Sequence, residues 1–402
     1  MQKYKYQWYI LFLMMLVWGG GGIAHNCISY LFPYFSKSFS LGMEHNGYLS
    51  GVLALFWCMS ILICGKLLAY FKAKNIMCCG ILLASVSFLF LSLTSDISFV
   101  YIFVAFVGFG CGSIVPTSFS ILTKFCDPKR RGLFFGAAQS SYTFIGSAIG
   151  TIMFTRFANS EIGWQGSFLI IGIILCIVCA LILSCQNIFL EKEEIKEKQE
   201  NNLTEVLKYK NILLATFLTC LAMMWYFTTA SYGIIYLNLS REASIVQAGV
   251  VFSGFGIGGF IGEFLGPTVS DYFGRKKTVA ILASLGGLAF FTFVKMDVSW
   301  GLTTFLLAVA SCFMSGAMII LNSVIPSESV PIYLSERATS FTPAMGEIFG
   351  GVFAPIIVGF LTKTIAIENI MVGIAVLPLL ICIGSIFFKE TVLIDKNNNE
   401  KV

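Results

Sequence analysis

Two carboxyl groups lie deep inside long apolar stretches of this sequence. Glu263 and Glu347 each stand about eight residues, roughly 12 Å of helix, from the nearer end of their stretch. An ionised carboxylate at that depth in hydrocarbon is costly, so each side chain is expected to bind and release protons. A carboxyl group that takes up a proton on one side and releases it on the other could couple solute movement to a proton gradient. The alternative is a structural hydrogen bond or an ion pair, for example with Arg337.

His25 is a third ionisable group inside an apolar stretch, and the chain has only 2 histidines. Imidazole titrates near neutral pH, so His25 could carry a proton or bind a polar solute. A neutral histidine that is hydrogen-bonded to a neighbouring helix is an equally good interpretation. Asn26 follows directly, and the glycines at 19–22 precede it. Consecutive glycines permit close helix approach or local bending.

Other polar and aromatic side chains recur at helical spacing. Trp225, Thr229 and Tyr232 share one face with Tyr236, and Tyr226 lies beside them. Such rings and hydroxyls suit a small organic solute, although an aromatic packing stripe has the same pattern. Two polar amides and a hydroxyl complete the predicted binding residues: Gln139, Thr143 and Asn322. The amides are the more informative, because burying them is costly.

The elements that position these residues must be membrane-spanning helices. The 402 residues are 57% hydrophobic and only 12% charged, which no soluble domain tolerates. Apolar stretches long enough to cross about 30 Å of hydrocarbon recur twelve times. They run near 8–35, 46–71, 76–94, 98–122, 133–157, 166–186, 211–239, 246–271, 278–296, 300–325, 339–364 and 370–388.

The basic residues set the expected orientation. Of 26 Lys and Arg residues, only Lys37, Arg156, Arg241, Lys295 and Lys363 fall on the side opposite the termini. The positive-inside rule therefore places both termini in the cytoplasm of a multi-pass cell-membrane protein. Residues 188–210 form a polar linker between two six-helix halves, 1–187 and 211–389, and 390–402 form a cytoplasmic tail.

Composition and motifs exclude other classes. There is no phosphate-binding loop and no H-E-x-x-H, so we do not expect an enzyme. The Cys176-x-x-Cys179 pair lies within a helix and has no second pair, so we expect neither a metal nor a cofactor. Nothing indicates nucleic-acid binding. The expected partners are the lipid bilayer, a small-molecule substrate and protons, and we expect a monomer.

A short hairpin motif identifies the family. Asp271-Tyr272-Phe273-Gly274-Arg275-Lys276-Lys277 joins two apolar stretches, and a weaker copy at 65–74 has Ala69 and Lys72 in place of the aspartate and glycine. This D-x-x-G-R-K-K pattern, repeated about two hundred residues apart, resembles the hairpin signature of the major facilitator superfamily. The resemblance implies an all-α polytopic membrane protein with twelve transmembrane helices, in two six-helix bundles related by a pseudo-twofold axis.

The resemblance also implies a function and a gate. Members are secondary transporters that work by alternating access, and charges at the cytoplasmic surface latch one conformer. The corresponding residues here are Asp271, Gly274, Arg275, Glu328 and Arg337. The sequence as a whole resembles bacterial carriers of organic acids or related metabolites. Proton-coupled uptake is therefore expected, with Glu263, Glu347 and His25 as coupling groups.

Two alternatives remain at this point. A multidrug or metabolite efflux antiporter of the same family usually carries a Gly-Pro motif where this chain has Gly146-Ser147. A transporter-like solute sensor would need an output surface. An organic acid would normally require a mid-membrane Lys or Arg, and this sequence has none, so a neutral or cationic solute also stays open.

Overall fold

The computed structural model describes residues 6–127, 130–184 and 203–391. Within these residues, eleven helices are long and apolar enough to cross a membrane. A twelfth crossing is the continuous helical run α6 (Arg131–Ser141), η3 (Tyr142–Ile149) and α7 (Gly150–Ala158). Its middle carries the polar run Gln139 to Thr143, which lowers its hydropathy relative to the others. The predicted all-α fold is confirmed.

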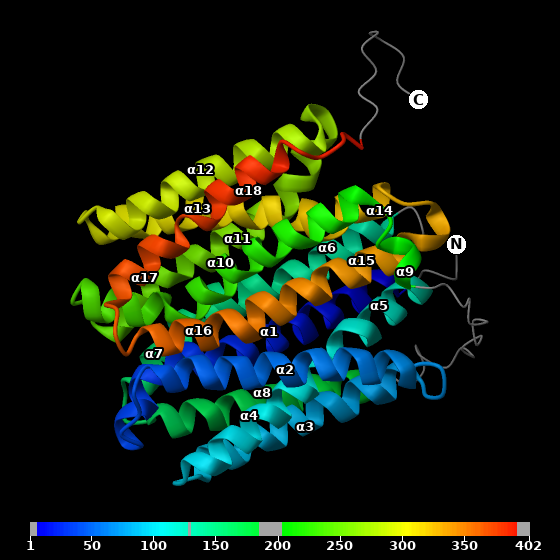
Figure 1. Cartoon of the computed structure of the whole chain (residues 1–402). Coiled ribbons are helices and arrows are strands. Elements are labelled where there is room, and N and C mark those ends of the chain that lie inside the picture. Colours follow the sequence, from blue (N-terminus) through cyan, green and yellow to red (C-terminus); the bar gives the residue numbers. More distant parts are fainter. Residues whose placement is uncertain (1–5, 128–129, 185–202, 392–402) are drawn as a thin grey trace.

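The N-terminal bundle occupies the lower part of Figure 1. Besides α6, η3 and α7, it consists of α1 (Gln7–Ser38), α2 (Glu44–Leu67), α3 (Ala73–Leu93), α4 (Ile97–Gly112), α5 (Ile114–Phe125) and α8 (Gly163–Ser184). Helices α4 and α5 form one crossing. The predicted 46–71 helix ends at Leu67, followed by a turn at 68–70.

The C-terminal bundle lies above it. The short α9 (Leu203–Val206) leads to α10 (Lys210–Ser240), α11 (Ile245–Phe273) and α12 (Arg275–Lys295). The last three crossings are segmented: α13 (Trp300–Ile319), η5 (Ile320–Val324) and α14 (Ile325–Glu328); α15 (Ile332–Gly346), η6 (Glu347–Phe353) and α16 (Ala354–Leu361); α17 (Ile367–Ile374) and α18 (Leu377–Ser385). Most of the predicted linker lies outside the described residues. The eleventh crossing begins at Ile332, seven residues before its apolar stretch, because Pro331 opens the helix.

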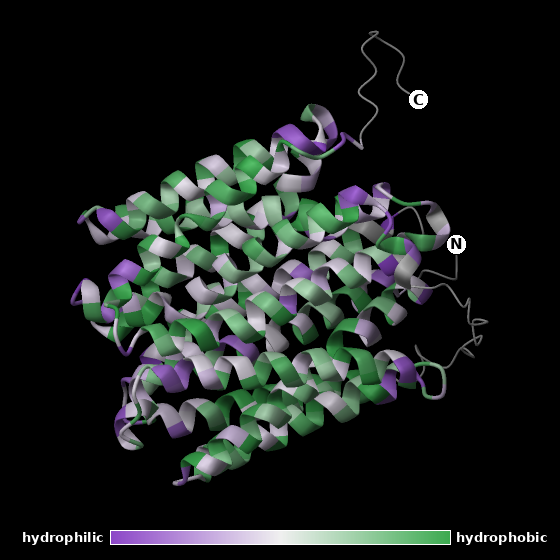
Figure 2. Ribbon diagram, in the orientation of Figure 1, coloured by the Kyte–Doolittle hydropathy of each residue, from purple (hydrophilic) through white to green (hydrophobic). Residues whose placement is uncertain are grey.

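The outer surface matches a lipid environment. Figure 2 shows hydrophilic residues concentrated at the ends of the helices and hydrophobic ones along their lengths. Large apolar side chains such as Leu62, Leu288 and Phe305 are more than 60% exposed (66%, 64% and 62%). A soluble protein rarely tolerates such a surface, whereas a bilayer stabilises it. The chain is a multi-pass membrane protein.

Glycine stripes bring helix backbones together within each bundle. On α11, glycines recur every four residues at 254, 258, 262 and 266, facing Thr304, Ala308, Cys312 and Gly316 of α13. A Cβ on Gly258 or Gly262 would strike the carbonyl oxygen of Ala308 or Cys312. In the N-terminal bundle the corresponding pair of helices is α2 and α4. There the glycine lies on α4, the second helix of the pair, where Gly108 faces Leu53 of α2. These are small-residue crossings typical of membrane helices.

The two bundles are sealed together at the end of the molecule far from the termini, which we call the far side. There Asn46 of α2 donates to the Ser231 carbonyl of α10 at 2.7 Å. The Ser231 and Ser50 hydroxyls are 3.3 Å apart, and Lys363 pairs with Glu44 at 3.4 Å. Gly47 of α2 lies directly against the Pro355 carbonyl of α16.

The bundles are less tightly packed toward the opposite end, which we call the terminal side. Gly136 of α6 is exposed, and a Cβ there would come no closer than 3.9 Å to its nearest neighbour, Phe264 of α11. Gln139, one turn further along, is half-buried. Together with the sealed far side, this describes a conformation closed at one end.

Candidate functional site

The three ionisable groups predicted from sequence lie midway along helices that meet between the bundles. His25 is on α1, Glu263 on α11, and Glu347 begins η6. All three are deep in the protein yet keep partly accessible side chains. We call this place the junction. Accessible polar groups at mid-depth, between bundles rather than toward lipid, are what a solute pathway requires.

Aromatic rings surround His25 on three sides. The ring centroid of Trp57 (α2) is 5.1 Å away, that of Tyr142 (η3) 5.9 Å edge-on, and that of Phe227 (α10) 5.8 Å in a stacked arrangement. The Nδ1 atom of His25 is buried and has no hydrogen-bond partner among the described residues. The helix-to-helix hydrogen bond considered as an alternative for His25 is therefore absent at Nδ1. The imidazole presents a polar atom to an aromatic enclosure.

The two carboxyl groups differ in their contacts. The Glu263 carboxylate lies 3.5 Å from the Thr143 hydroxyl of η3 in the other bundle, and that hydroxyl also donates to the Ser140 carbonyl at 2.9 Å. Glu347 makes no hydrogen bond or ion pair within the described part of the chain, so the pairing with Arg337 does not occur. It lies close enough to Cys58, Tyr142 and Tyr226 to interact with them electrostatically.

Tyr226 lies near both carboxyl groups. It is 4% exposed and interacts electrostatically with both Glu263 and Glu347; its hydroxyl lies beside Ser147 but makes no hydrogen bond of standard geometry within the described residues. Its ring contacts Phe227 at 5.3 Å. An unpartnered buried hydroxyl is destabilising, by about 1–3 kcal/mol, so such a group marks a place for a missing polar partner.

The remaining aromatic residues predicted on α10 face elsewhere. Trp225 packs within the C-terminal bundle against Phe255 and Phe290. Tyr232 donates to the Pro355 carbonyl at 3.1 Å in the far-side seal, and Tyr236 donates to Val294 at 2.8 Å. The face that reaches the junction is one residue further round the helix, at Tyr226 and Phe227.

Four other predicted binding residues have distinct surroundings. Asn26 is 9% exposed and donates to the Gly22 carbonyl at 2.9 Å and to the Ser147 hydroxyl at 3.4 Å. Thr229 is fully buried, and its hydroxyl has no partner. Asn322, in η5, accepts from Ser323 at 2.7 Å. Gln139 remains half-buried on α6. Asn26 thus joins α1 to η3.

Two π-helical segments lie in the middle of their crossings. Tyr142 begins η3 and Glu347 begins η6, in crossings five and eleven, which occupy equivalent places in the two halves. A π-helix is rare and occurs frequently at functional sites. The apolar pattern of the sequence carries no signal for it. Trp57 and Phe227, which line the junction, were not singled out from sequence either, because each lies in an ordinary apolar run.

The predicted latch residues meet at the terminal side. Arg275 forms two hydrogen bonds with the Glu328 carboxylate, at 2.7 and 3.1 Å, and pairs with Asp271 at 2.6 Å. Gly274 turns the chain there with φ +86°. Arg337 is not part of this ion-pair cluster. The Glu390 carboxylate accepts from the backbone N–H groups of both Arg275 and Lys276, at 2.8 and 3.2 Å, and so caps α12.

Removing Arg275 should destabilise this end of the bundle. Arg275→Ala leaves Glu328 without its bidentate partner, and we expect a loss of about 2 kcal/mol. The figure is below that for a fully buried pair because Asp271 and Glu328 are 60% and 30% exposed. Thermal unfolding in detergent would show a midpoint lowered by several degrees. The neighbouring exposed Lys277→Ala is the control, and an equal effect of the two variants would contradict this assignment.

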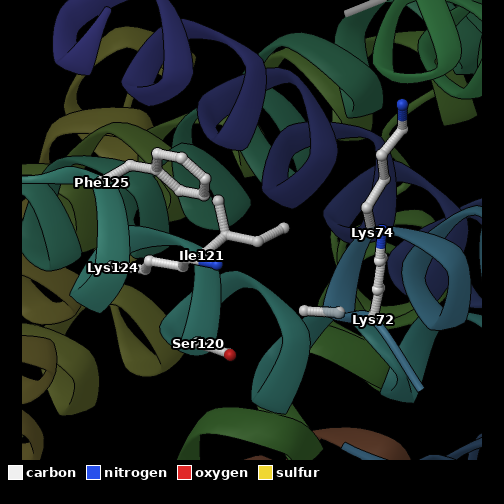
Figure 3. Close-up of a pocket in the computed structure, with 7 residues that line it drawn as sticks. Lys72, Lys74, Ser120, Ile121, Lys124 and Phe125 are labelled. Atoms are coloured by element: carbon white, nitrogen blue, oxygen red, sulfur yellow. The ribbon is translucent and has the colours of Figure 1, made fainter. Parts of the chain in front are cut away.

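A small pocket lies away from the junction. It is formed between the start of α3 and the end of α5, and Figure 3 shows Lys72, Lys74 and Lys124 around it. The Lys74 ammonium group donates to the Leu183 carbonyl at 3.3 Å. Basic residues at this end of the helices agree with the expected cytoplasmic orientation of the terminal side.

Two six-helix bundles that meet at a mid-depth cluster of ionisable and aromatic side chains define a membrane carrier. The family model described as "Major Facilitator Superfamily" matches residues 8–342 and 212–401. The chain belongs to this superfamily, as the hairpin motif indicated, and is therefore a secondary transporter and not an enzyme.

Solved structures share the fold at low sequence identity. A bacterial homologue of the human lysosomal transporter Spinster, in an inward-facing and occupied conformation, has a TM-score of 0.80 at 15% identity. That alignment covers 95% of this chain and 96% of the other. A point mutant of the nucleoside transporter NupG has a TM-score of 0.74 at 14% identity, covering 94% of this chain and 98% of the other.

Curated relatives are more similar in sequence but are matched over shorter spans. A "Probable hexose phosphate transport protein" of Chlamydia trachomatis is 24% identical over 304 residues, covering 64% of this chain and 66% of that protein. The "Probable galactarate/D-glucarate transporter GudP" of Escherichia coli is 28% identical over 182 residues, covering 42% and 39%.

Proposed function

We propose that this chain is a proton-coupled uptake carrier for a small organic solute. The observation that carries the proposal is the placement of Glu263, Glu347 and His25 at mid-depth between the bundles, without basic partners. Groups that can exchange protons there supply the coupling, and Tyr226 and the rings around His25 supply contacts for the solute.

Transport proceeds by alternating access. The far side, expected to face the exterior, is sealed by Asn46, Ser50, Ser231 and the Glu44–Lys363 pair. The conformation is then inward-facing, and solute leaves past α6 and α11 toward the cytoplasm. Rocking the bundles opens the far side and brings the terminal sides together, and the Asp271–Arg275–Glu328 cluster holds the C-terminal bundle rigid at that surface.

The relatives suggest an organic acid as the solute. Both are named as carriers of anionic sugar derivatives, and our sequence analysis favours the same class. Such a solute would rely on His25, Gln139 and hydroxyl groups, because no Lys or Arg of the described residues lies at the junction. Two rivals remain for experiment: an efflux antiporter and a solute sensor.

Uptake into proteoliposomes tests the proposal. With an inside-alkaline pH gradient, we expect one solute from a radiolabelled panel of carboxylates, sugars, amino acids and amines to accumulate. Collapse of the gradient with an ionophore should abolish the accumulation, and protein-free liposomes serve as the blank. Accumulation indifferent to the gradient would contradict proton coupling. Extrusion of preloaded solute in place of uptake would favour the antiporter, and binding without movement the sensor.

Closure of the far side should be necessary for turnover. Gly47→Leu places a side chain against Pro355 and Tyr232, and we expect this overpacking to cost about 1–3 kcal/mol in the sealed state. Transport should fall about tenfold or more. Hydrogen–deuterium exchange should quicken at the far ends of α2 and α10. Gly301→Leu, at a far-side glycine with open space around it, is the matched control. Unchanged exchange and transport would contradict the role of this seal.

A further inference from the structure

The junction has two carboxyl groups and, among the described residues, no Lys or Arg; its one basic side chain is the imidazole of His25. In α1, α2 and α10 the Lys and Arg residues stand only at helix ends (Lys37, Lys66, Lys210), α11 has none, and Arg337 of α15 lies ten residues before Glu347. The ion pairs of the described residues do not involve Glu263 or Glu347. Charged carboxylates in such a low-dielectric place need either protons or a cationic partner. An anionic solute would add like charge to this site.

The aromatic rings at the junction also favour a positively charged ligand. Trp57, Tyr142 and Phe227 stand around His25 with centroids 5.1–5.9 Å from its ring. The face of an aromatic ring carries negative electrostatic potential and attracts an ammonium group, so a ligand that binds beside His25 would meet a favourable aromatic surface. Tyr226 adds a second, independent observation. Its hydroxyl is buried, lies beside Ser147 without a hydrogen bond of standard geometry among the described residues, and interacts electrostatically with both carboxyl groups, so it can accept a hydrogen bond from a ligand bound near them.

The two carboxyl groups are suited to different tasks. Glu263 lies 3.5 Å from the Thr143 hydroxyl, a weak contact because that hydroxyl also donates to the Ser140 carbonyl at 2.9 Å, whereas Glu347 has no such contact among the described residues. Even a weak contact restricts where the Glu263 carboxylate can lie, and a counter-charge that is positioned before binding is the better one for a ligand. An unanchored one can exchange its proton as its surroundings change.

We propose that the solute is an organic cation, an amine or quaternary ammonium compound, whose charge is held by Glu263 and by the aromatic rings around His25. This inference rests on the proposed carrier function. It keeps Glu347 as the coupling group and replaces the organic acid suggested by the relatives.

Equilibrium binding to the purified full-length chain in detergent tests the substrate class without any gradient. The cationic probes are choline, tyramine and tetraethylammonium. The uncharged carbon isostere of choline, 3,3-dimethylbutan-1-ol, measures the contribution of charge, and D-glucarate and glucose 6-phosphate represent anions. We expect at least one cation to bind at millimolar concentration or below. If choline binds, its uncharged isostere should bind with an affinity lower by about tenfold or more.

Variants locate the charge contact. Glu263→Gln keeps the shape of the side chain and removes its charge, so affinity for the bound cation should fall about tenfold or more. Glu263→Asp should keep the preference for cations, which separates loss of charge from misfolding. Phe227→Leu should lower the affinity for cations more than the affinity for the uncharged isostere. The exposed Glu161→Gln is the control and should leave binding unchanged.

Three outcomes would overturn the inference: an anion that binds more tightly than every cation, no binding of any of the three cations, or cation affinity unchanged in folded Glu263→Gln. Each leaves proton-coupled transport standing, because binding in detergent requires no gradient. Conversely, if cations bind but uptake does not depend on the pH gradient, the proposal of proton coupling is contradicted and the proposal of a cation site is retained.

Discussion

Replacing Glu347 by glutamine is expected to abolish gradient-driven accumulation while leaving solute exchange in place. Glutamine has nearly the shape of a protonated glutamate but cannot release a proton. The variant should therefore still bind the solute and should lose only the proton-coupling step. In proteoliposomes with the membrane potential clamped at zero, the accumulation ratio driven by an inside-alkaline gradient should fall to about one. Exchange between labelled and unlabelled solute should continue near the wild-type rate.

The position of Glu347 explains why a single atom exchange should act so strongly. It begins η6 at the level of His25, is partly accessible, and has neither a hydrogen bond nor an ion pair within the described residues. Among the described residues, no hydrogen-bond or ion-pair partner keeps Glu347 in one protonation state while the site opens to one side of the membrane and then to the other. Glu161→Gln, a change at an exposed loop carboxylate, is the matched control. If Glu347→Gln accumulates solute as the wild type does, Glu347 is not the coupling group.

Enlarging Gly262 is expected to destroy the packing of the C-terminal bundle. A valine there must displace the backbone of α13, since the first added carbon already meets the Cys312 carbonyl. Gly258 and Gly266 hold the same two helices together one turn away on each side, so the helices cannot separate locally. We expect a loss of more than about 3 kcal/mol, beyond ordinary overpacking, because rigid backbone has to move.

Thermal unfolding and the yield of monodisperse protein in detergent measure this effect. The matched control is Gly373→Val on α17, where a Cβ meets nothing within 4 Å. The control should keep wild-type stability, because the same residue change there costs no packing. A Gly262→Val protein as stable as Gly373→Val would show that α11 and α13 do not approach as closely as described.

Local patterns indicated part of the terminal-side ion-pair cluster, although Arg337 is not in it. Asp271 and Arg275 lie on either side of a tight turn, so their pairing follows from the freedom of Gly274 to adopt positive φ. The partner Glu328 came from the family resemblance. Glu390, which caps α12 from beyond the last crossing, could not be predicted, because nothing in its local sequence indicates which helix end lies nearby.

The binding residues show the limit of the same reasoning. The spacing of Trp225, Thr229 and Tyr232 correctly places them near one another on α10, but spacing cannot say what that face contacts. In the structure Trp225 packs inside the C-terminal bundle, while Tyr226 and Phe227 reach the junction. Glu263 and Glu347 were identifiable because charge within apolar sequence is conspicuous, whereas Trp57 was hidden among other apolar residues.

The sequence by itself determined that this chain crosses a membrane many times, which family it resembles, and which ionisable groups lie at mid-depth. Hydrocarbon imposes these properties: each crossing must satisfy its own backbone and exclude charge, so length and composition are sufficient. Only the tertiary structure decided which helix faces meet, that Tyr226 lies near both carboxyl groups, and that the far side is sealed. Helical periodicity relates side chains on one helix, but the rotation of that helix toward its neighbours is set by packing, such as that of the glycine stripes, which depends on both partners at once.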